Sequence, residues 1–223
     1  MYGPRWEFAL PSDPTTTVIM RPAQLPADAE ELARLLQDPV VLDFVSLDHS
    51  PTANEELEHF EKVGQDKSFH WMIAVRTQDG TESLVGVSGL HVSEYFGESR
   101  RLSSGILLAN RAWWGRGVAS ATHRLRTWHA FNVQGAFAIN SCFIEGNDGS
   151  GRALAGVGYT QVGRNERSHL VNGQWRDEVL LTCYNPAALP VMWPDGDVPE
   201  YILKAVEKTK QALEWAKDIL APR

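Results

Sequence analysis

The stretch that most constrains this chain is WWGRGVAS, residues 113–120, because it places two glycines, one residue apart, directly before a helical pattern. Apolar residues recur at helical spacing over 117–133, which predicts a helix there. The first N–H groups of a helix have no partner within it, and the helix dipole adds positive charge at the same end. Glycines let a backbone approach a bulky anion closely. The stretch therefore favours a site for an anion such as pyrophosphate, with a tight structural turn as the alternative.

The residues around Gly115 and Gly117 agree with an anion site. Arg116 supplies a cation between the two glycines, and Ala119 keeps the first turn of the helix small. No acidic residue occurs in the chain between positions 98 and 145, so nothing in this stretch repels a phosphate. Two other phosphate-binding patterns are excluded, since the chain has neither a G-x-x-x-x-G-K-[ST] string nor an early G-x-G-x-x-G turn.

The remaining pattern predicts a mixed α/β domain built around one sheet. Asp79-Gly80 and Asn172-Gly173 are typical hairpin turns, and the last helix has an amphipathic stripe. The expected strands are 17–22, 69–76, 83–95, 100–109, 136–144, 159–171 and 174–184, and the expected helices are 26–39, 52–63, 117–133, 148–157 and 198–220. Residues 1–16 are expected to form an extended N-terminal arm, and residues 186–223 a linker and a helix that packs on the domain or on a partner subunit.

Composition and charge narrow the class of protein. The formal net charge of −7 argues against nucleic acid as the main partner. No stretch reaches the roughly 18 apolar residues that span a bilayer, and the N-terminus lacks the pattern of a signal peptide. Cys142 and Cys183 lie in strand-like runs, which predicts buried thiols in a reducing compartment rather than a disulfide or a zinc site. We expect a cytoplasmic protein without a bound metal and without a membrane or nucleic-acid partner.

Residues 114–119, WGRGVA, resemble the Q/R-x-x-G-x-G/A motif of the GNAT superfamily of N-acetyltransferases, with Trp114 in place of Gln or Arg. The tryptophan variant is similar to the ribosomal-protein N-terminal (Rim-type) acetyltransferases. That branch also shows N-x-x-S-x-x-x-L-x-x-x-G-[FY], and the chain matches it at all five positions: Asn147, Ser150, Leu154, Gly158 and Tyr159. The terminal hairpin, with Arg-Asp after its Gly turn, agrees. The resemblance covers 17–185, the expected acetyltransferase domain.

The resemblance implies a GNAT-like, mostly antiparallel sheet flanked by helices, with the C-terminal amphipathic helix as an addition. It implies acetyl-CoA as the cosubstrate and a primary amine as the acceptor, and it leaves a homodimer open. The backbone at the end of a strand would bind the pantetheine arm, and the glycine turn would hold the pyrophosphate. The residues implied for the donor are Leu107, Leu108, Ala109, Trp114, Gly115, Arg116, Gly117, Val118, Ala119, Ser120, Asn147 and Ser150.

The catalytic residues are less well defined by this pattern. Many relatives carry a Tyr four residues after the Ser position, where this chain has Leu154, so Ser150 is the expected substitute beside the leaving thiolate. His91 and Glu94 rank level as candidates for the base that deprotonates the amine, and Glu145 ranks third. The region 39–70 and the hairpin 159–184 are expected to build the acceptor site.

Three functions remain open on the sequence. The first is acetyl-CoA-dependent N-acetylation of a primary amine, either a protein N-terminus or a small molecule. The second is a non-catalytic module that binds acyl-CoA, which the missing Tyr and the undecided base motivate. The third is an antibiotic-modifying acetyltransferase.

Overall fold

The computed structural model describes residues 1–45, 49–65, 67–92 and 96–221, and it divides into two compact units. Unit 1 comprises 1–91 and 105–118, and unit 2 comprises 92–104 and 119–223. The elements of unit 1 are β1 Trp6–Leu10, β2 Asp13–Arg21, α1 Ala27–Leu35, α2 Pro39–Leu42, α3 Ala53–Val63, β3 Phe69–Arg76, nearly all of β4 Glu82–Val92, and the second half of β5 Arg101–Leu108.

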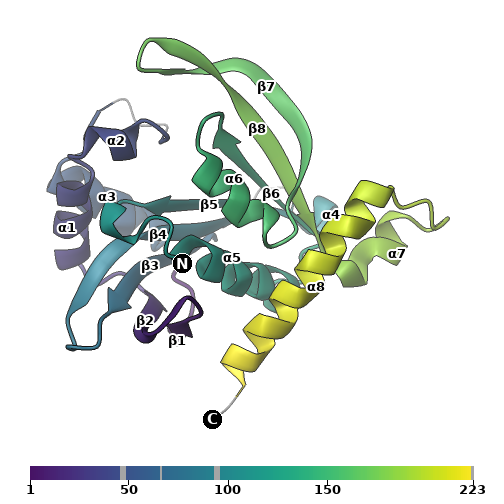
Figure 1. The fold of residues 1–223 in the computed structure, drawn as a ribbon, viewed down its shortest axis with the longest axis horizontal. Helices are drawn as coiled ribbons and strands as arrows, with labels where there is room; N and C mark the ends of the chain where they lie inside the picture. Colours follow the sequence, from purple (N-terminus) through teal and green to yellow (C-terminus); the bar gives the residue numbers. More distant parts are fainter. Residues whose placement is uncertain (46–48, 66, 93–95, 222–223) are drawn as a thin grey trace. The chain divides into compact units, whose positions relative to one another are not determined.

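Unit 2 carries the first half of β5 and the C-terminal elements of the chain (Figure 1). These elements are α4 Phe96–Ser99, α5 Val118–Trp128 with a π-helical extension His129–Val133, β6 Ala138–Ile144, α6 Asp148–Ala155, β7 Thr160–Val171, β8 Gln174–Tyr184, α7 Leu189–Met192 and α8 Glu200–Leu220. The chain passes between the units within β5 and at the start of α5, so the glycine turn lies at the end of unit 1.

The strands follow the order β1-β2-β3-β4-β5-β6-β8-β7 in one eight-stranded sheet. The pairs β1–β2, β2–β3, β3–β4, β6–β8 and β7–β8 are antiparallel, whereas β5 and β6 are parallel. The parallel ladder joins 101–103 to 138–140, so the backbone of β5 from Ser104 to Leu108 lies outside it. This sheet with helices confirms the predicted mixed, mostly antiparallel α/β fold.

The N-terminal segment differs from the expected arm. Residues 6–10 form strand β1, which pairs with β2, and β2 begins at Asp13 rather than at residue 17. Phe8 is buried, and the Trp6 ring stacks on Trp71 with 5.5 Å between centroids. Residues 6–10 and 13–16 are therefore strand residues of the sheet rather than an extended arm.

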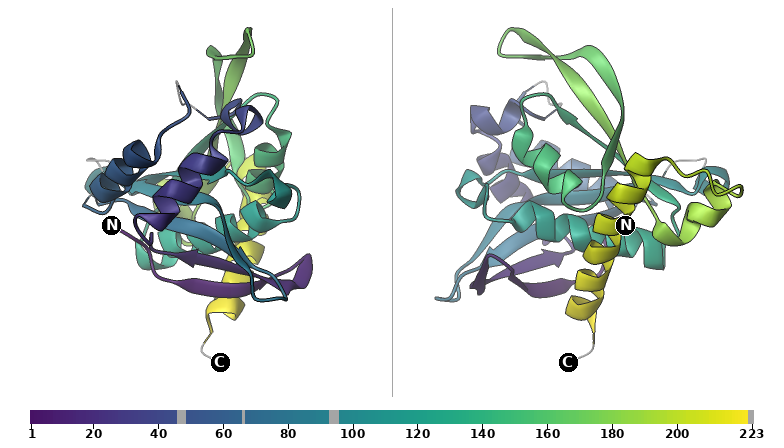
Figure 2. Two further views of the ribbon diagram at one scale, coloured as in Figure 1. Left: turned by 90° about the vertical axis from the view of Figure 1, so that its left-hand side faces the viewer. Right: turned by 45° about the vertical axis from the view of Figure 1, so that its right-hand side comes forward.

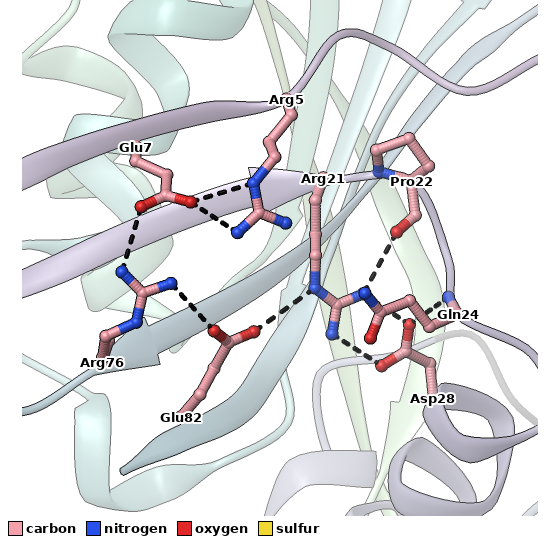
Figure 3. A network of polar contacts seen from close by, with 8 residues as sticks. All are labelled: Arg5, Glu7, Arg21, Pro22, Gln24, Asp28, Arg76 and Glu82. Carbon is pink, nitrogen blue, oxygen red and sulfur yellow. Dashed lines mark hydrogen bonds and ion pairs between the residues drawn. The ribbon is translucent and has the colours of Figure 1, made fainter. Parts of the chain in front are cut away.

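A chain of ion pairs crosses β1–β4 of unit 1 (Figure 3). At its buried end, Arg21 donates to both carboxylate oxygens of Asp28, at 2.6 and 2.9 Å. Glu82 joins Arg21 to Arg76, and Glu7 accepts from Arg76 at 3.0 Å. Asp28 is therefore the partner of a buried arginine, and Pro26 takes the cap position of α1.

The apolar core of unit 1 lies between α1, α3 and the sheet. Helices α1 and α3 lie side by side in the views of Figure 2. Thr52 and Glu55 form a capping box at the start of α3. The core cluster consists of Ala29, Leu32, Leu36, Val41, Phe60, Met72, Leu84 and Ala109.

In unit 2, helix α8 packs against the base of the β7–β8 hairpin (Figure 1). Ile202 and Val206 of α8 are buried against Ala138 and Tyr184. One expectation for the thiols was wrong: Cys142 is exposed, whereas Cys183 is buried as predicted.

Candidate functional site

Both glycines of the turn before α5 adopt a left-handed backbone conformation. Gly115 has φ +71° and Gly117 has φ +90°, a region that residues with a Cβ atom rarely occupy. Helix α5 begins at Val118, directly after the second glycine, and has no acidic residue in its first turn. The turn and the helix start therefore lie where the sequence predicts them. A Cβ at position 115 would meet nothing within 4 Å, so at that position only the backbone conformation requires glycine.

The turn between β1 and β2 supports this loop, and the sequence did not predict this support. Ser12 Oγ donates a hydrogen bond of 2.6 Å to the carbonyl of Arg116, and a Cβ on Gly117 would lie 3.3 Å from the same Oγ. Asp13 is also near enough to be influenced by the Arg116 charge. Its pKa is lowered by hydrogen bonds from Thr15 and Thr16, with Arg116 adding to the effect. An acid close to the loop was not expected, because the sequence places it about a hundred positions away.

Trp114 anchors the loop to the end of β5. Its indole N–H donates to the carbonyl of Leu108 at 2.8 Å, although the residue is 40% exposed. The Arg111 guanidinium lies over the Trp114 ring, 5.6 Å from its centroid, and also pairs with Asp38 at 3.2 Å. A cavity of about 230 Å³ lies beside this ion pair, lined by Arg34, Leu35, Asp38, Ala109, Asn110, Arg111 and Ala112. The Arg116 guanidinium likewise lies over the ring of Trp113.

The predicted pantetheine strand, Leu107–Ala109, runs close to the backbone of β4. A Cβ on Gly86 would lie 1.9 Å from the Leu107 carbonyl oxygen, so no other residue fits at position 86. The Asn110 N–H donates to the carbonyl of Val85 at 3.1 Å. Gly86 was missed on the sequence, where a glycine inside a strand pattern was the available signal for such a close approach.

His91 lies near the end of β4, and its ring is close to two glycines of the sheet. Its Nε2 would be 2.9 Å from a Cβ on Gly89 and 3.9 Å from a Cβ on Gly105. His91 and Gly105 are exposed, and the His91 ring meets His70 edge-on at 5.2 Å. His91 is thus an exposed imidazole that lies beside Gly89, Gly105 and His70. Glu94, the other leading base candidate, lies outside the described residues.

In unit 2, Asn147 is the N-cap of α6, and its side-chain oxygen accepts from the backbone N–H of Ser150 at 3.1 Å. This bond occupies the Asn147 oxygen and fixes the first turn that carries Ser150. Leu154, at the position of the missing Tyr, is buried in the core. Glu145, the third base candidate, is paired with Arg164 at 2.9 Å. The predicted pair Asn147 and Ser150 is therefore brought together in unit 2.

Comparison with known proteins identifies a family whose members are similar to this chain. Residues 17–160 match a family model described as acetyltransferase (GNAT) domain. No curated protein matches the chain. None of the helices in the described ranges is long and apolar enough to cross a bilayer.

Solved structures of similar fold come from several bacteria. The chain is similar to a ribosomal-protein-S5-alanine acetyltransferase from Vibrio fischeri, with 16% identity, a TM-score of 0.64, and coverage of 82% of this chain and 98% of that one. It is similar to Mycobacterium smegmatis RimJ in complex with CoA-disulfide, with 20% identity, a TM-score of 0.61, and coverage of 92% and 94%. It is also similar to spermidine N-acetyltransferase from Vibrio cholerae in complex with CoA and spermine, with 15% identity, a TM-score of 0.63, and coverage of 76% and 95%. At such identities the likeness concerns the fold.

Proposed function

The chain belongs to the GNAT acetyltransferase family, and from this premise we propose that it transfers the acetyl group of acetyl-CoA to a primary amine. The observation that carries the proposal is the glycine loop. Gly115 and Gly117 are both in the left-handed region, and they lead into a helix whose first turn has no acid. A helix start of this kind binds phosphate through backbone N–H groups.

The residues of the loop fit the pyrophosphate of acetyl-CoA. The N–H groups of residues 115–119 would bind it, with the hydroxyl of Ser120 behind them. Ser12 and Trp114 hold the loop from either side, through the Arg116 and Leu108 carbonyls. A loop fixed in this way loses little conformational freedom on binding.

The end of β5 would orient the rest of the donor. Acetyl-CoA supplies an activated thioester, and the backbone of Leu107–Ala109 would pair with its pantetheine arm in the manner of an added strand. N–H groups of the same segment can polarise the thioester carbonyl. Gly86 supports this use, because its close approach to Leu107 sets the path of the strand end.

Proton transfer at the amine is proposed for His91. An amine attacks only when it is neutral, so a base must take the proton of the ammonium form. His91 is exposed, and histidine is the side chain that most often carries out such a proton transfer in enzymes. Ser150 is proposed to donate to the leaving thiolate, from the turn that Asn147 caps. Glu94 stays a second candidate for the base.

The acceptor class is a primary amine on a peptide N-terminus or on a small molecule. The Trp-Gly variant of the motif and the RimJ-like fold favour the Rim-like branch and thus a peptide N-terminus, whereas the likeness to a spermidine N-acetyltransferase favours a polyamine. Two other candidate functions are a non-catalytic acyl-CoA-binding module, which the buried leucine at the Tyr position favours, and an antibiotic-modifying acetyltransferase.

A screen for CoA release tests the proposal. The protein is incubated with acetyl-CoA and a panel of N-terminal peptides, polyamines and aminoglycosides, and free thiol is measured. At least one amine is expected to give turnover, and His91→Ala is expected to lower kcat by about 100-fold for that amine. Tight acetyl-CoA binding with no turnover on any amine would contradict the transferase and favour the binding module. Turnover on aminoglycosides alone would favour the antibiotic-modifying enzyme.

A further inference from the structure

A short chain of contacts joins helix α2 to the end of β5, and all of it lies within unit 1. Asp38 is the N-cap of α2, and its Oδ1 accepts from the backbone N–H of Val40 at 3.0 Å. Its other oxygen, Oδ2, accepts from Arg111 Nη1 at 3.2 Å. The Asp38 carboxylate therefore binds α2 through one oxygen and the segment after β5 through the other.

Arg111 continues this chain of contacts toward the glycine loop. Its guanidinium lies over the Trp114 ring, 5.6 Å from the centroid, and the Trp114 indole N–H donates to the Leu108 carbonyl at 2.8 Å. Leu108 belongs to the segment 107–109 that is proposed above to bind the pantetheine arm, and Trp114 directly precedes Gly115. One arginine thus contacts both the cap of α2 and the residue that anchors the proposed donor site.

Helix α2, Pro39–Leu42, depends on such contacts for its position. It has only four residues, and a single helical turn has little stability of its own. Val41 belongs to the same apolar core cluster as Ala109, the residue that follows β5. Asp38 adds a charged contact to the same region of unit 1. The order of α2 is therefore linked to the end of β5 in two ways, one apolar and one charged.

The surroundings of Arg111 make its position sensitive to its two partners. The cavity of about 230 Å³ described above is lined by Arg111 and Asp38, and a side chain beside a cavity has fewer packing partners on that side. The exposed fraction of the side chain is 49% for Arg111 and 35% for Asp38. The Asp38 carboxylate and the Trp114 ring therefore largely determine where the guanidinium lies.

We propose that Arg111 is a positioning residue that couples the donor site to α2, an inference that rests on the donor site proposed above. A donor bound along 107–109 restricts the strand end and with it Trp114. Trp114 then restricts Arg111, and Arg111 holds Asp38 at the cap of α2. Local opening of α2 thus becomes rarer when the donor is bound, and the same coupling favours the donor when α2 is ordered.

This coupling has a consequence for the order of binding. Helix α2 begins the region 39–70 that is expected to build the acceptor site, so the coupling favours binding of acetyl-CoA before the amine. The effect is of modest size, because an exposed ion pair and a cation–π contact each contribute little in water.

Two conservative substitutions isolate the charged contact. Asp38→Asn keeps an oxygen that caps a helix as well as aspartate does, but it removes the negative charge that faces Arg111. Arg111→Gln removes the positive charge and the planar guanidinium. Arg34→Gln is the matched control, because Arg34 lines the same cavity but donates to Glu31 of its own helix, at 2.7 and 2.6 Å.

Hydrogen–deuterium exchange measures the coupling without turnover. Exchange of the backbone amides of 36–45 is followed by mass spectrometry in the free protein and in the protein saturated with CoA. CoA is expected to slow this exchange at least about threefold in the wild type and in Arg34→Gln. In Asp38→Asn and Arg111→Gln, CoA is expected to slow it less than about 1.5-fold. The double variant is expected to match the single variants, because the two residues act as a pair.

The variants are expected to fold, because the ion pair is exposed and contributes little to stability. A change in Tm of less than about 3 °C is expected in scanning calorimetry. If Arg111→Gln unfolds, Asp38→Asn carries the test, since it leaves the cap of α2 in place. A purely structural role of the pair would speed exchange equally in the free and the CoA-bound protein, and the ratio of the two rates would stay that of the wild type.

The same protection of 36–45 by CoA in the wild type, Asp38→Asn and Arg111→Gln would overturn the inference, since α2 would then respond to the donor by another route. A wild type that binds no CoA, or that binds it without protection of this segment, would overturn it as well. Protection that depends on Arg111, without acetyl transfer to any amine, would instead contradict the proposed transferase and leave the coupling standing.

Discussion

Replacement of Gly117 by alanine probes the glycine loop with a control that the chain itself provides. Gly117 has φ +90°, and Gly80, in the turn between β3 and β4, has nearly the same φ of +86°. A Cβ on Gly80 would meet nothing within 4 Å, whereas one on Gly117 would lie 3.3 Å from Ser12 Oγ. The two substitutions therefore impose similar backbone strain at two places, of which one is the proposed pyrophosphate site.

The expected cost in stability is similar for the two variants. A residue with a Cβ loses about 1–2 kcal/mol in the left-handed region. For a chain of this size, that loss lowers Tm by about 2–8 °C. Crowding at Ser12 adds little, because a single flexible hydroxyl can move aside. Differential scanning calorimetry of Gly117→Ala and Gly80→Ala measures this term.

The two variants are expected to differ in their affinity for acetyl-CoA. In Gly117→Ala the backbone relaxes toward negative φ, which turns N–H groups at the start of α5 away from the ligand. We expect the Kd for acetyl-CoA to rise at least about tenfold, equivalent to about 1.4 kcal/mol, and to change less than twofold in Gly80→Ala. If calorimetric titration gives both variants the affinity of the wild type, the assignment of the pyrophosphate to this loop is refuted.

Three further predictions concern the support of the loop and the stability of unit 2. Ser12→Ala removes the 2.6 Å hydrogen bond to the Arg116 carbonyl. It is expected to raise KM for acetyl-CoA about two- to tenfold without changing KM for the amine. An unchanged KM for acetyl-CoA would show that the loop does not need this hydrogen bond. Burial lowers the pKa of His129 from 6.5 to about 4, so the unfolded chain binds more protons between these values. The contribution of neutral His129 to the free energy of unfolding is thus complete above pH 6.5 and falls by about 3 kcal/mol as the pH drops to 4. In urea titrations, His129→Gln is expected to make the free energy of unfolding depend less steeply on pH in this range. An identical pH dependence in the variant would contradict the lowered pKa of His129. Gly158 has φ +99°, and Gly158→Ala would place a Cβ 2.2 Å from Thr209 Oγ1 of α8. The free energy of unfolding, measured in urea, is expected to fall by about 2–5 kcal/mol. A fall of less than about 1 kcal/mol would mean that α8 is not fixed against Gly158.

The sequence predicts the local structure of the loop well, because its causes are local. Glycines at 115 and 117, followed by small residues and a helical period, suffice to define a left-handed turn and a helix start. The same holds for the capping box of α3 and for the Asn172-Gly173 hairpin. Each of these features depends on residues within a few positions of one another.

Features that depend on distant residues could not be predicted in this way. The Ser12 contact with Arg116 joins positions about a hundred residues apart. Through this contact, a segment that the sequence predicts as an extended arm supports the glycine loop. Asp28 fits an N-cap by local rules, but a buried arginine on β2 captures it.

A crystal structure of the protein grown with CoA tests the central claim most directly. The account predicts pyrophosphate oxygens within hydrogen-bonding distance of the backbone N–H groups of residues 115–119, with Ser12 still bonded to the Arg116 carbonyl. CoA bound at any other place, with the loop making no contact to its phosphates, would contradict the account.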